Sequence, residues 1–585
     1  MINRPILQSI LAIAAVVFAS AGVSTAQTVS HTTPHTTAAS GDETITLGGT
    51  TFINQGLQGV GRISASTLDP FGETLGAASG LQITNWIGTG TSYTGTLNVL
   101  PDRGYNTTIA GNNFFSAYQA RIEQVNFSFT PYTGMANIGG TDVASKIAAQ
   151  NQISFTSPIT AVRFTYDDPI TGTTNFTTGL DPGTSRATIF GKTVPYVTSY
   201  TGLQSPSATS NTTYTNINRL PLDSEALVLK SDGSGYIGDE YGANIYHFDA
   251  NKRIDGVITP PAAIQPHTPA GTLNFNSVSA PTDGRRNNQG MEGVALSPDG
   301  TRLFALLQSA AVQDASNSAN QTRLNTRLLI YDVSGSATPG APMKEYALQL
   351  PTYTGNGGGG TANNTAAQSE IVMIDNNRFL VLSRDANGLG SIATNQSVVK
   401  SVLLVDLSVG NPTNFAGTAR NNAGGLITTA PGVLDAAVTP LSWAEAVNLL
   451  NTTQLAKFNL QLDAGGTTQV SKLTLGEKWE GMTLVSANDA AHPNDYFLFV
   501  ANDNDFLTSG GKMIGPDGTL VDYNGFNGYP AQRVPGAVDP STANENDLMF
   551  LAYRVTIGPV PEPSTYALML AGLIGIGLIA RRHRK

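Results

Sequence analysis

The chain of 585 residues contains no cysteine, few charged residues and only six histidines. The absence of cysteine excludes disulfide bonds and thiolate metal sites, so stability has to come from burial and from bound cations. Charged residues make up only 13% of the chain and the net charge is −10, which argues against nucleic acid as a partner because nucleic acid requires a basic surface. The acidic balance instead favours divalent cations. Sixty-two glycines and frequent Thr, Ser and Asn are typical of an all-β protein with many turns.

The first 26 residues have the three parts of a secretion signal. They contain a positive charge at Arg4, an apolar run over 10–18 and small residues at 24–26. We therefore expect export and cleavage by signal peptidase after residue 26. A buried N-terminal helix is the alternative, since the run is short for a membrane span. Residues 27–45, rich in Thr, Ser and His, are predicted to form a flexible leader.

Residues 558–585 resemble a PEP-CTERM sorting signal. They contain Val-Pro-Glu-Pro-Ser-Thr, an uncharged and mostly apolar stretch at 566–580, and a basic cluster at 581–585. The basic cluster favours the cytoplasmic side, so residues 566–580 are predicted to be a short transmembrane segment that anchors the chain transiently in the inner membrane. The resemblance implies cleavage by an exosortase and delivery to the cell surface or extracellular matrix of a Gram-negative-type bacterium. A permanent tail anchor is the alternative, although it would need a longer apolar stretch.

Between these signals, residues 46–557 are predicted to form the folded domain, with short β-type runs separated by turns. Four repeats begin with a glutamate that precedes a small or apolar residue and a β-run, and these are Glu225, Glu292, Glu370 and Glu480. Each repeat continues through a turn into a second run with a polar end, and these ends include Asp239, Glu240, Arg384 and Asp503. A fifth unit that contains Asp102 and Arg103 fits the same frame without the glutamate.

The glutamates are 67, 78 and 110 residues apart. This spacing is too irregular for a stacked solenoid but suits four-stranded propeller blades with loop insertions. We therefore predict a β-propeller and expect six blades. Residues 163–216 and 355–367 are predicted to be insertions. A helix is predicted from Ser442 to about Leu450, because Ser442 and Glu445 have the spacing of a capping box.

Several of these strings resemble the phytase-like family that is named for esterase-like activity of phytase. They lie at 222–227, 238–242, 288–300, 478–482 and 502–506. The resemblance extends from about residue 59 to residue 555, with one departure at Ala226, where the family usually has glycine. It implies a β-propeller and hydrolysis of phosphoesters or related esters, but it supplies no set of catalytic residues.

One polar position repeated at the start of each innermost strand would gather acidic side chains at one mouth of the central channel. The candidate metal ligands are Glu225, Asp239, Glu240, Glu292, Glu370, Glu480 and Asp503. Carboxylates confined in this way raise each other's pKa unless a cation neutralises them, and Ca²⁺ accepts many oxygen ligands in irregular geometry. The alternative is that these glutamates cap strand amides or pair with Arg103 and Arg384.

These residues suggest an exported, Ca²⁺-dependent hydrolase. Water activated by the metal would attack phosphorus or a carbonyl carbon, while Arg103, Arg286 or Arg384 holds the anion. Glu292, Glu480, Arg384 and Arg103 are the candidate catalytic residues. The alternative is a non-catalytic surface or matrix propeller that binds cations or glycans such as extracellular polysaccharide. The sequence lacks the motifs of α/β-hydrolase serine enzymes, zinc peptidases and P-loop proteins.

Overall fold

The computed structural model describes residues 30–31, 43–76, 78–355, 357, 359–391, 395–463, 471–526 and 545–559. The predicted signal peptide at 1–26 and the predicted membrane segment at 566–580 both lie outside these residues. Within the described part of the chain, no helix is long and apolar enough to cross a membrane.

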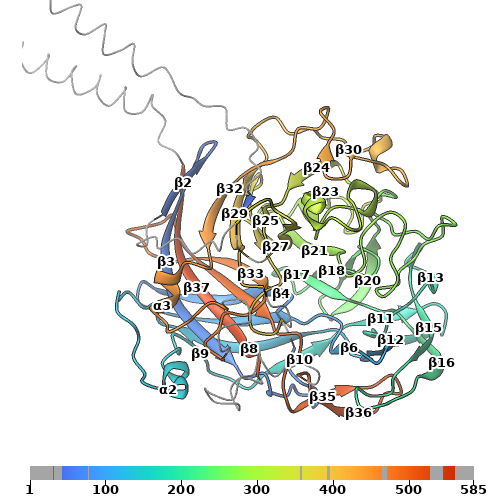
Figure 1. Ribbon diagram of the computed structural model, residues 1–585, viewed down its shortest axis with the longest axis horizontal. Helices are drawn as coiled ribbons and strands as arrows, with labels where there is room; N and C mark the ends of the chain where they lie inside the picture. Colours follow the sequence, from blue (N-terminus) through green and yellow to red (C-terminus); the bar gives the residue numbers. More distant parts are fainter. Residues whose placement is uncertain are drawn as a thin grey trace, which may run out of the picture.

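The described residues form a five-bladed β-propeller (Figure 1). The innermost strands are β4 (Gly80–Thr89), β17 (Ser224–Leu229), β21 (Met291–Leu296), β27 (Ala367–Met373) and β33 (Lys478–Ser486). Each of these strands packs beside the next, and β33 packs beside β4, which closes the ring. The prediction of six blades is therefore wrong. The five repeats recognised in the sequence are the five blades, because the insertions extend existing blades instead of building another.

In each of the first four blades, the order of the main strands from the channel outwards is their order in the sequence. Blade 1 consists of β4, β5 (Ser92–Leu100), β8 (Arg121–Phe129) and β10 (Thr160–Arg163), with β9 (Ile153–Phe155) also paired to β8. Blade 2 begins with β17, β18 (Gly235–Asp239), β19 (Ile245–Phe248) and β20 (Arg253–Ile258). Blade 3 consists of β21, β22 (Arg302–Leu307), β23 (Asn325–Asp332) and β24 (Lys344–Gln349). Blade 4 consists of β27, β28 (Arg378–Arg384), β29 (Lys400–Asp406) and β32 (Ser442–Asn448).

The predicted insertion at 163–216 adds strands to the outside of blade 2. Strands β11 (Thr165–Asp168) and β12 (Thr173–Phe176) extend its sheet beyond β20, so this blade has six strands. Two separate hairpins follow, β13 (Arg186–Ile189) with β14 (Lys192–Pro195) and β15 (Val197–Gly202) with β16 (Thr212–Arg219).

Short elements lie on the loops between the main strands. The hairpins are β6 (Asn106–Ile109) with β7 (Asn112–Phe115), β30 (Thr428–Ala430) with β31 (Val433–Leu434), and β35 (Gly511–Ile514) with β36 (Leu520–Tyr523). A small sheet combines β1 (Ser30–His31), β25 (Thr352–Tyr353) and β26 (Asn364–Thr365), so the second predicted insertion (355–367) connects and includes part of this sheet. The α-helices are α2 (Val143–Ala148) and α3 (Thr452–Ala456), and the 3₁₀ helices are η1 (Val312–Asp314), η2 (Asn320–Leu324) and η3 (Ala419–Asn421).

The fifth blade joins the two ends of the folded chain. Its sheet runs from β33 through β34 (Asp495–Asp503), β37 (Leu548–Pro559) and β3 (Thr50–Ile63) to β2 (Glu43–Leu47). Strands β3 and β37 are antiparallel, and their register begins with Thr50 opposite Pro559 and ends with Ile63 opposite Leu548. Because β2 begins at Glu43, the end of the predicted leader at 27–45 belongs to this blade.

The helix predicted from Ser442 to Leu450 is wrong, because Ser442–Asn448 forms strand β32. This strand pairs along its length with β29 at the outer edge of blade 4. The side chain of Trp443 is buried between blades, and the Glu445 carboxylate accepts a hydrogen bond from the Ser401 hydroxyl across the sheet. Tertiary pairing therefore overrides the local capping-box spacing. The helix comes later, where Asn451 caps α3.

The hydrophobic core lies between neighbouring blades, and β37 contributes to it on both faces. Leu551 packs with Trp479 and Leu404 between blades 4 and 5. Phe550, the preceding residue, packs with Phe499 between blades 5 and 1. All five side chains are fully buried. A strand whose alternate side chains are buried on both faces belongs in the interior of a packed assembly.

Replacing Leu551 with alanine tests how much β37 contributes to the stability of the fold. We expect Leu551→Ala to lower the free energy of unfolding by about 2–5 kcal/mol, because it removes buried apolar surface and leaves a cavity. Leu520→Ala is the matched control, since Leu520 is 49% exposed on the β35–β36 hairpin. Urea denaturation followed by circular dichroism measures both changes. Equal effects of the two substitutions would contradict the central position of β37.

Candidate functional site

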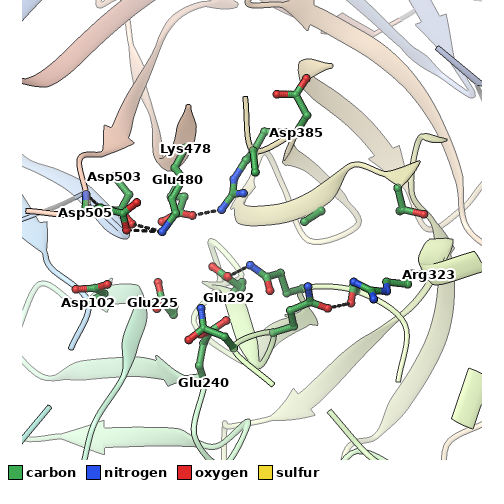
Figure 2. A pocket seen from close by; sticks show the side chains of 18 of the residues that line it. Asp102, Glu225, Glu240, Glu292, Arg323, Asp385, Lys478, Glu480, Asp503 and Asp505 are labelled. Atoms are coloured by element: carbon green, nitrogen blue, oxygen red, sulfur yellow. Dashed lines mark hydrogen bonds and ion pairs between the residues drawn. The ribbon is translucent and has the colours of Figure 1, made fainter. Parts of the chain in front are cut away.

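A polar cavity of about 450 Å³ lies where the first two strands of the blades meet (Figure 2). The residues that line it from the starts of innermost strands are Glu225, Glu292, Lys478 and Glu480. Those that follow or end second strands are Asp102, Arg103, Glu240, Gln308, Ser309, Arg384, Asp385, Asp503 and Asp505. Because the two strands are antiparallel, the start of one and the end of the other share one edge of the blade. The propeller thus brings together thirteen polar side chains from distant parts of the sequence.

A β-bulge at the start of the innermost strand sets the direction of the glutamates. In β21, Met291 pairs with Leu307 and Gly293 pairs with Leu306, so Glu292 is left out of the ladder. The register shifts in the same way around Glu225 and Glu480. The extra residue of a bulge is unpaired and its side chain is redirected, and here all three glutamates line the cavity.

The structure does not bring Glu370 to this group. In β27 the residue left out of the ladder is Ser369, while Glu370 pairs with Leu382. The Glu370 carboxylate accepts a hydrogen bond from the Ile371 amide at 2.9 Å and another from the Val294 amide of β21. Burial raises the pKa of Glu370 well above its ordinary value. Glu370 therefore caps strand amides, as the alternative interpretation of the sequence proposed, beside the apolar part of the channel.

Asp239, another predicted ligand, also accepts hydrogen bonds from backbone amides. One of its carboxylate oxygens accepts the Asp223 amide at 3.1 Å, and the other accepts the Gly242 amide at 2.9 Å. Asp239 is fully buried and is not part of the cavity lining. Burial raises its pKa to about 7. Its two hydrogen bonds hold the turn that carries Glu240 to the cavity.

Three of the four basic side chains in the lining are bound to carboxylates. Arg384 pairs with Glu480, and Lys478 Nζ lies 3.1 Å from Asp503 Oδ2 and 2.5 Å from Asp505 Oδ1.

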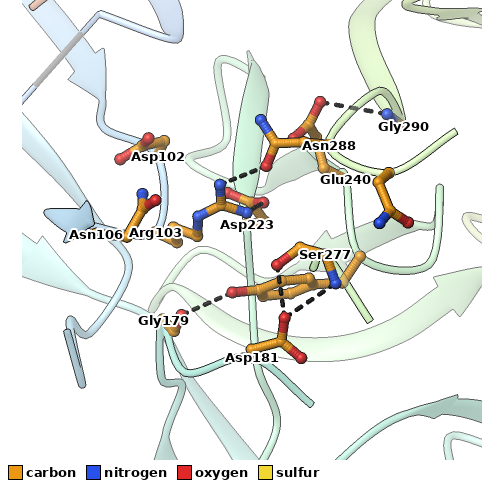
Figure 3. A network of polar contacts seen from close by, with 12 residues as sticks. Asp102, Arg103, Asn106, Gly179, Asp181, Asp223, Glu240, Ser277, Asn288 and Gly290 are labelled. Carbon is orange, nitrogen blue, oxygen red and sulfur yellow. Dashed lines mark hydrogen bonds and ion pairs between the residues drawn. The ribbon is translucent and has the colours of Figure 1, made fainter. Parts of the chain in front are cut away.

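Arg103 is the third of these basic residues, and it connects blade 1 to the segments that lead into blades 2 and 3. Its guanidinium donates to Asp223 and to Asn288 (Figure 3). Burial would lower the pKa of Arg103, but the negative charge of Asp223 raises it well above its ordinary value. Arg103 is therefore held in place as a permanent cation.

Acidic groups outnumber basic groups in the cavity, with eight carboxylates against four basic side chains. Burial raises the pKa of Asp503 in this lining to about 6, and it raises the pKa of the neighbouring Asp223 to about 7. For Glu225, the charges of Glu292 and other acids add to the effect of burial. Within the described part of the chain, Asp223 Oδ1 and Glu292 Oε2 are buried without a hydrogen-bond partner. Unpaired buried carboxylate oxygens are costly, so the cavity has unused capacity for a cation.

Asp102 belongs to two groups of carboxylates that could hold a metal ion. One group is Asp102, Asp503 and Asp505, the other is Asp102, Asp223 and Glu225, and within each group the ligand atoms lie within 4.8 Å of one another. Both offer oxygen ligands alone, which suit a hard cation such as Ca²⁺. Asp223, whose Oδ1 has no hydrogen-bond partner among the described residues, belongs to the second group.

Sequence reasoning named only two of these five residues, Glu225 and Asp503. The repeated strings contain Asp102, Asp223 and Asp505, but at the polar ends of the second runs only Asp239, Glu240 and Asp503 are predicted as ligands. The signal that could have found Asp102 and Asp505 is their common place at the end of a second strand. The four candidate catalytic residues, Glu292, Glu480, Arg384 and Arg103, all line the cavity.

The fold and this site define a five-bladed propeller with an acidic cavity at one mouth of its channel. The family model described as "Esterase-like activity of phytase" matches residues 76–506, and the chain belongs to this phytase-like family. The PEP-CTERM protein-sorting motif matches residues 559–585. This motif marks an exported protein and implies processing by an exosortase. The two matches confirm both resemblances seen in the sequence.

The chain is also similar to a secreted protein over most of the length of that protein. The chain is 30% identical to an uncharacterized secreted protein of Arthroderma benhamiae over 488 residues, which cover 79% of this chain and 89% of that protein. Solved structures align only loosely. A chain of the S. cerevisiae complex of Dbp5 with Nup159, Gle1, IP6 and ADP has 9% identity, a TM-score of 0.28 and coverage of 90% of this chain and 99% of that chain. The Myceliophteria thermophila Cps50 (Swd1) β-propeller domain has 8% identity, a TM-score of 0.24 and coverage of 81% and 99%.

Breaking the Arg384–Glu480 pair tests whether the folded state needs a basic partner for each buried carboxylate of the cavity. In the presence of chelator, we expect Arg384→Met to lower the free energy of unfolding by about 3 kcal/mol, because Glu480 would remain buried without its main partner. Adding Glu480→Gln to this variant should recover more than half of the loss, as a double-mutant cycle by urea denaturation would show. Additive losses from the two substitutions would contradict a direct coupling.

Proposed function

We propose that this exported propeller is a hydrolase of phosphoesters or related esters and that its activity depends on a divalent cation, with Ca²⁺ as the expected ion. The observation that supports the proposal most directly is the position of Asp102 between two groups of carboxylates, each within 4.8 Å. The excess of acidic over basic groups in the same cavity points in the same direction. Membership of the phytase-like family supports an ester as substrate.

The residues that would hold the cation are Asp102 with Asp503 and Asp505, or Asp102 with Asp223 and Glu225. When bound, such an ion supplies an activated water and neutralises the charge that develops on the ester oxygens. Carboxylates that lie so close together gain a counter-charge from it, which removes their mutual repulsion.

Glu292 is the best-placed group for moving a proton. Gln308 donates a hydrogen bond to Glu292 Oε1, while Oε2 has no partner among the described residues. Burial, and then the charge of Glu240, raise the pKa of Glu292 well above its ordinary value and favour its protonated form. The free oxygen of a protonated Glu292 can donate its proton to the leaving oxygen of an ester.

The arginines supply positive charge that does not titrate. Glu480 binds Arg384 and Asp223 binds Arg103, so both guanidinium groups are fixed in the wall of the cavity. Each Nε of these arginines lacks a hydrogen-bond partner within the described residues. Fixed guanidinium groups are suited to holding the negative oxygens of a phosphoester during attack.

The export route follows from the two ends of the chain. We infer that signal peptidase removes residues 1–26 and that residues 566–580 hold the chain at the inner membrane until an exosortase cleaves the tail. The mature propeller would then act at the cell surface or in the extracellular matrix, where Ca²⁺ is available to its acidic cavity.

Replacing Asp102 tests the cation site. We expect Ca²⁺ to raise the melting temperature of the wild-type domain, with a stabilisation of about 2.7 kcal/mol when its concentration is about 100 times Kd. Asp102→Asn should weaken Ca²⁺ binding at least about tenfold, because the residue belongs to both ligand groups and a buried charged contact contributes about 1.5–3 kcal/mol. Titration calorimetry and thermal melts with and without chelator measure both effects.

Asp167→Asn is the control for this experiment, since Asp167 is exposed on β11, where it pairs with Arg253. The control should bind Ca²⁺ as the wild type does. Equal Ca²⁺ affinity in the Asp102 variant and the control would remove Asp102 from the site.

Replacing Glu292 tests the proton transfer. We expect Glu292→Gln to lower kcat on phosphate or carboxyl esters by roughly 100-fold, which is the lower range for the loss of a general acid. Glu445→Gln, at a glutamate on the outer strand β32, is the matched control and should keep wild-type activity. Turnover is measured with Ca²⁺ and after chelation.

Two results would contradict the hydrolase. If the wild type turned over no phosphate monoester, phosphate diester or carboxyl ester with Ca²⁺ present, the enzymatic proposal would fail. Calcium binding without turnover would then favour the non-catalytic propeller that binds cations or glycans at the cell surface. Full activity of Glu292→Gln would leave the enzyme intact but remove this residue from its mechanism.

A further inference from the structure

A fourth basic side chain of the cavity, Arg323, lies apart from the acidic cluster. It projects from η2 on the side of the cavity opposite Asp102 and Asp503 (Figure 2). Arg286 lies close behind it, and both arginines contact the same loop residue. Arg286 Nη1 donates to Asn317 Oδ1 at 3.0 Å, and Arg323 Nη2 lies 3.5 Å from the Asn317 carbonyl oxygen.

These two arginines differ from the others at the site because no acidic partner compensates them. Among the described residues their hydrogen bonds go to Asn317 and to the backbone carbonyls of residues 315–317, and the Nε of each has no partner. Burial, and then the charge of Arg323, lower the pKa of Arg286 to about 10. Two neighbouring arginines that repel each other in a strongly acidic protein are stabilised when an anion binds between or beside them.

The wall around Arg323 is built from neutral hydrogen-bonding groups. Asn320 donates to Asn364 Oδ1 at 3.1 Å, and Thr365 donates to the Asn320 carbonyl at 2.9 Å. Ser309 donates to Gln289 Oε1 at 2.6 Å on the neighbouring part of the lining. Amides and hydroxyls of this kind can complete the hydrogen bonds of an oxyanion held by a guanidinium group.

We propose that Arg323 binds a second anionic group of the substrate, an oxyanion such as phosphate, sulfate or carboxylate, at the end of the cavity remote from the acidic cluster. The positive charge of Arg286, which contacts the same residue Asn317, adds to the attraction for this anion. The identity of the reacting group rests on the proposed function, whereas the anion site itself does not. Arg323 is a specificity residue in this scheme, and the preferred substrate is an ester that carries a further negative charge.

The first experiment measures binding without catalysis. The mature protein, kept in chelator so that no divalent cation contributes, is titrated with inorganic phosphate, sulfate and acetate by calorimetry. We expect at least one of these anions to bind, and the order of their affinities distinguishes a tetrahedral oxyanion from a carboxylate. Arg323→Gln should weaken that binding about tenfold, and Arg323→Lys should retain most of it because the charge remains. Arg186→Gln, at an exposed arginine of β13, is the matched control.

An unchanged affinity in Arg323→Gln, or the absence of binding by all three anions, would overturn the proposal. Circular dichroism of each variant shows that the fold is retained. A loss of affinity in Arg323→Gln together with unchanged binding by Arg186→Gln would support it, whichever anion binds most tightly.

The second experiment separates this proposal from the hydrolase. Two aryl phosphates that differ only in a sulfonate on the aryl ring are compared in the presence of Ca²⁺. We expect Arg323→Gln to raise KM about tenfold for the ester with the sulfonate and less than about twofold for the plain ester, with kcat unchanged for both. Equal effects on both esters would overturn the anion site. If the wild type cleaved neither ester, the proposed function would fail, and the calorimetric titration would still decide on Arg323.

Discussion

The pairing of β3 with β37 holds the propeller closed, and the cavity depends on that closure. Asp102 follows the second strand of blade 1, whereas Asp503 ends the second strand of blade 5 and Asp505 follows it. These carboxylates meet only because blade 5 packs against blade 1, and blade 5 is completed by strands from both ends of the chain. The site is therefore a property of the whole ring, and no single blade contains it.

The cavity has an uneven distribution of charge. Carboxylates from blades 1, 2, 3 and 5 crowd one side, where fixed cations such as Arg103 and Lys478 neutralise part of their charge. On the other side Arg323 has no acidic partner among the residues that the structure describes, and neutral amides lie beside it. A ligand with a cation at one end and an anionic group at the other would satisfy both sides. Under the proposed function, such a division of charge would allow a strongly acidic protein to bind a negatively charged ester.

The architecture was largely predictable because a propeller repeats its signal. A glutamate near the start of the innermost strand marked four blades, and the string around Asp102 marked the fifth. The number of blades was not predictable, since the insertion at 163–216 could equally have formed a separate blade as the outer strands that it does form. The strand at Ser442–Asn448 was mistaken for a helix because its capping-box spacing is local, whereas its pairing with β29 is not visible in the sequence.

The composition of the site was less predictable than its location. Glu370 occupies the same place in its sequence repeat as Glu292, yet a bulge shifted by one residue sends it to a backbone amide. A shift of one residue in a strand reverses the direction of a side chain, and no sequence pattern here records it. Asp239 was misjudged for a related reason, because its carboxylate satisfies two buried amides that only the folded turn creates.

The completion of blade 5 by strands from both ends of the chain also has a consequence for how the protein matures. Residues 43–63 leave the ribosome early but find their partner strand only when residues 548–559 have been made and translocated. A cation held by Asp102, Asp503 and Asp505 would join blade 1 to the blade that this pairing completes, so its binding energy would also stabilise the last folding step. A chain still threaded through the membrane would have no complete acidic cavity, and its ion capture would wait until translocation ends.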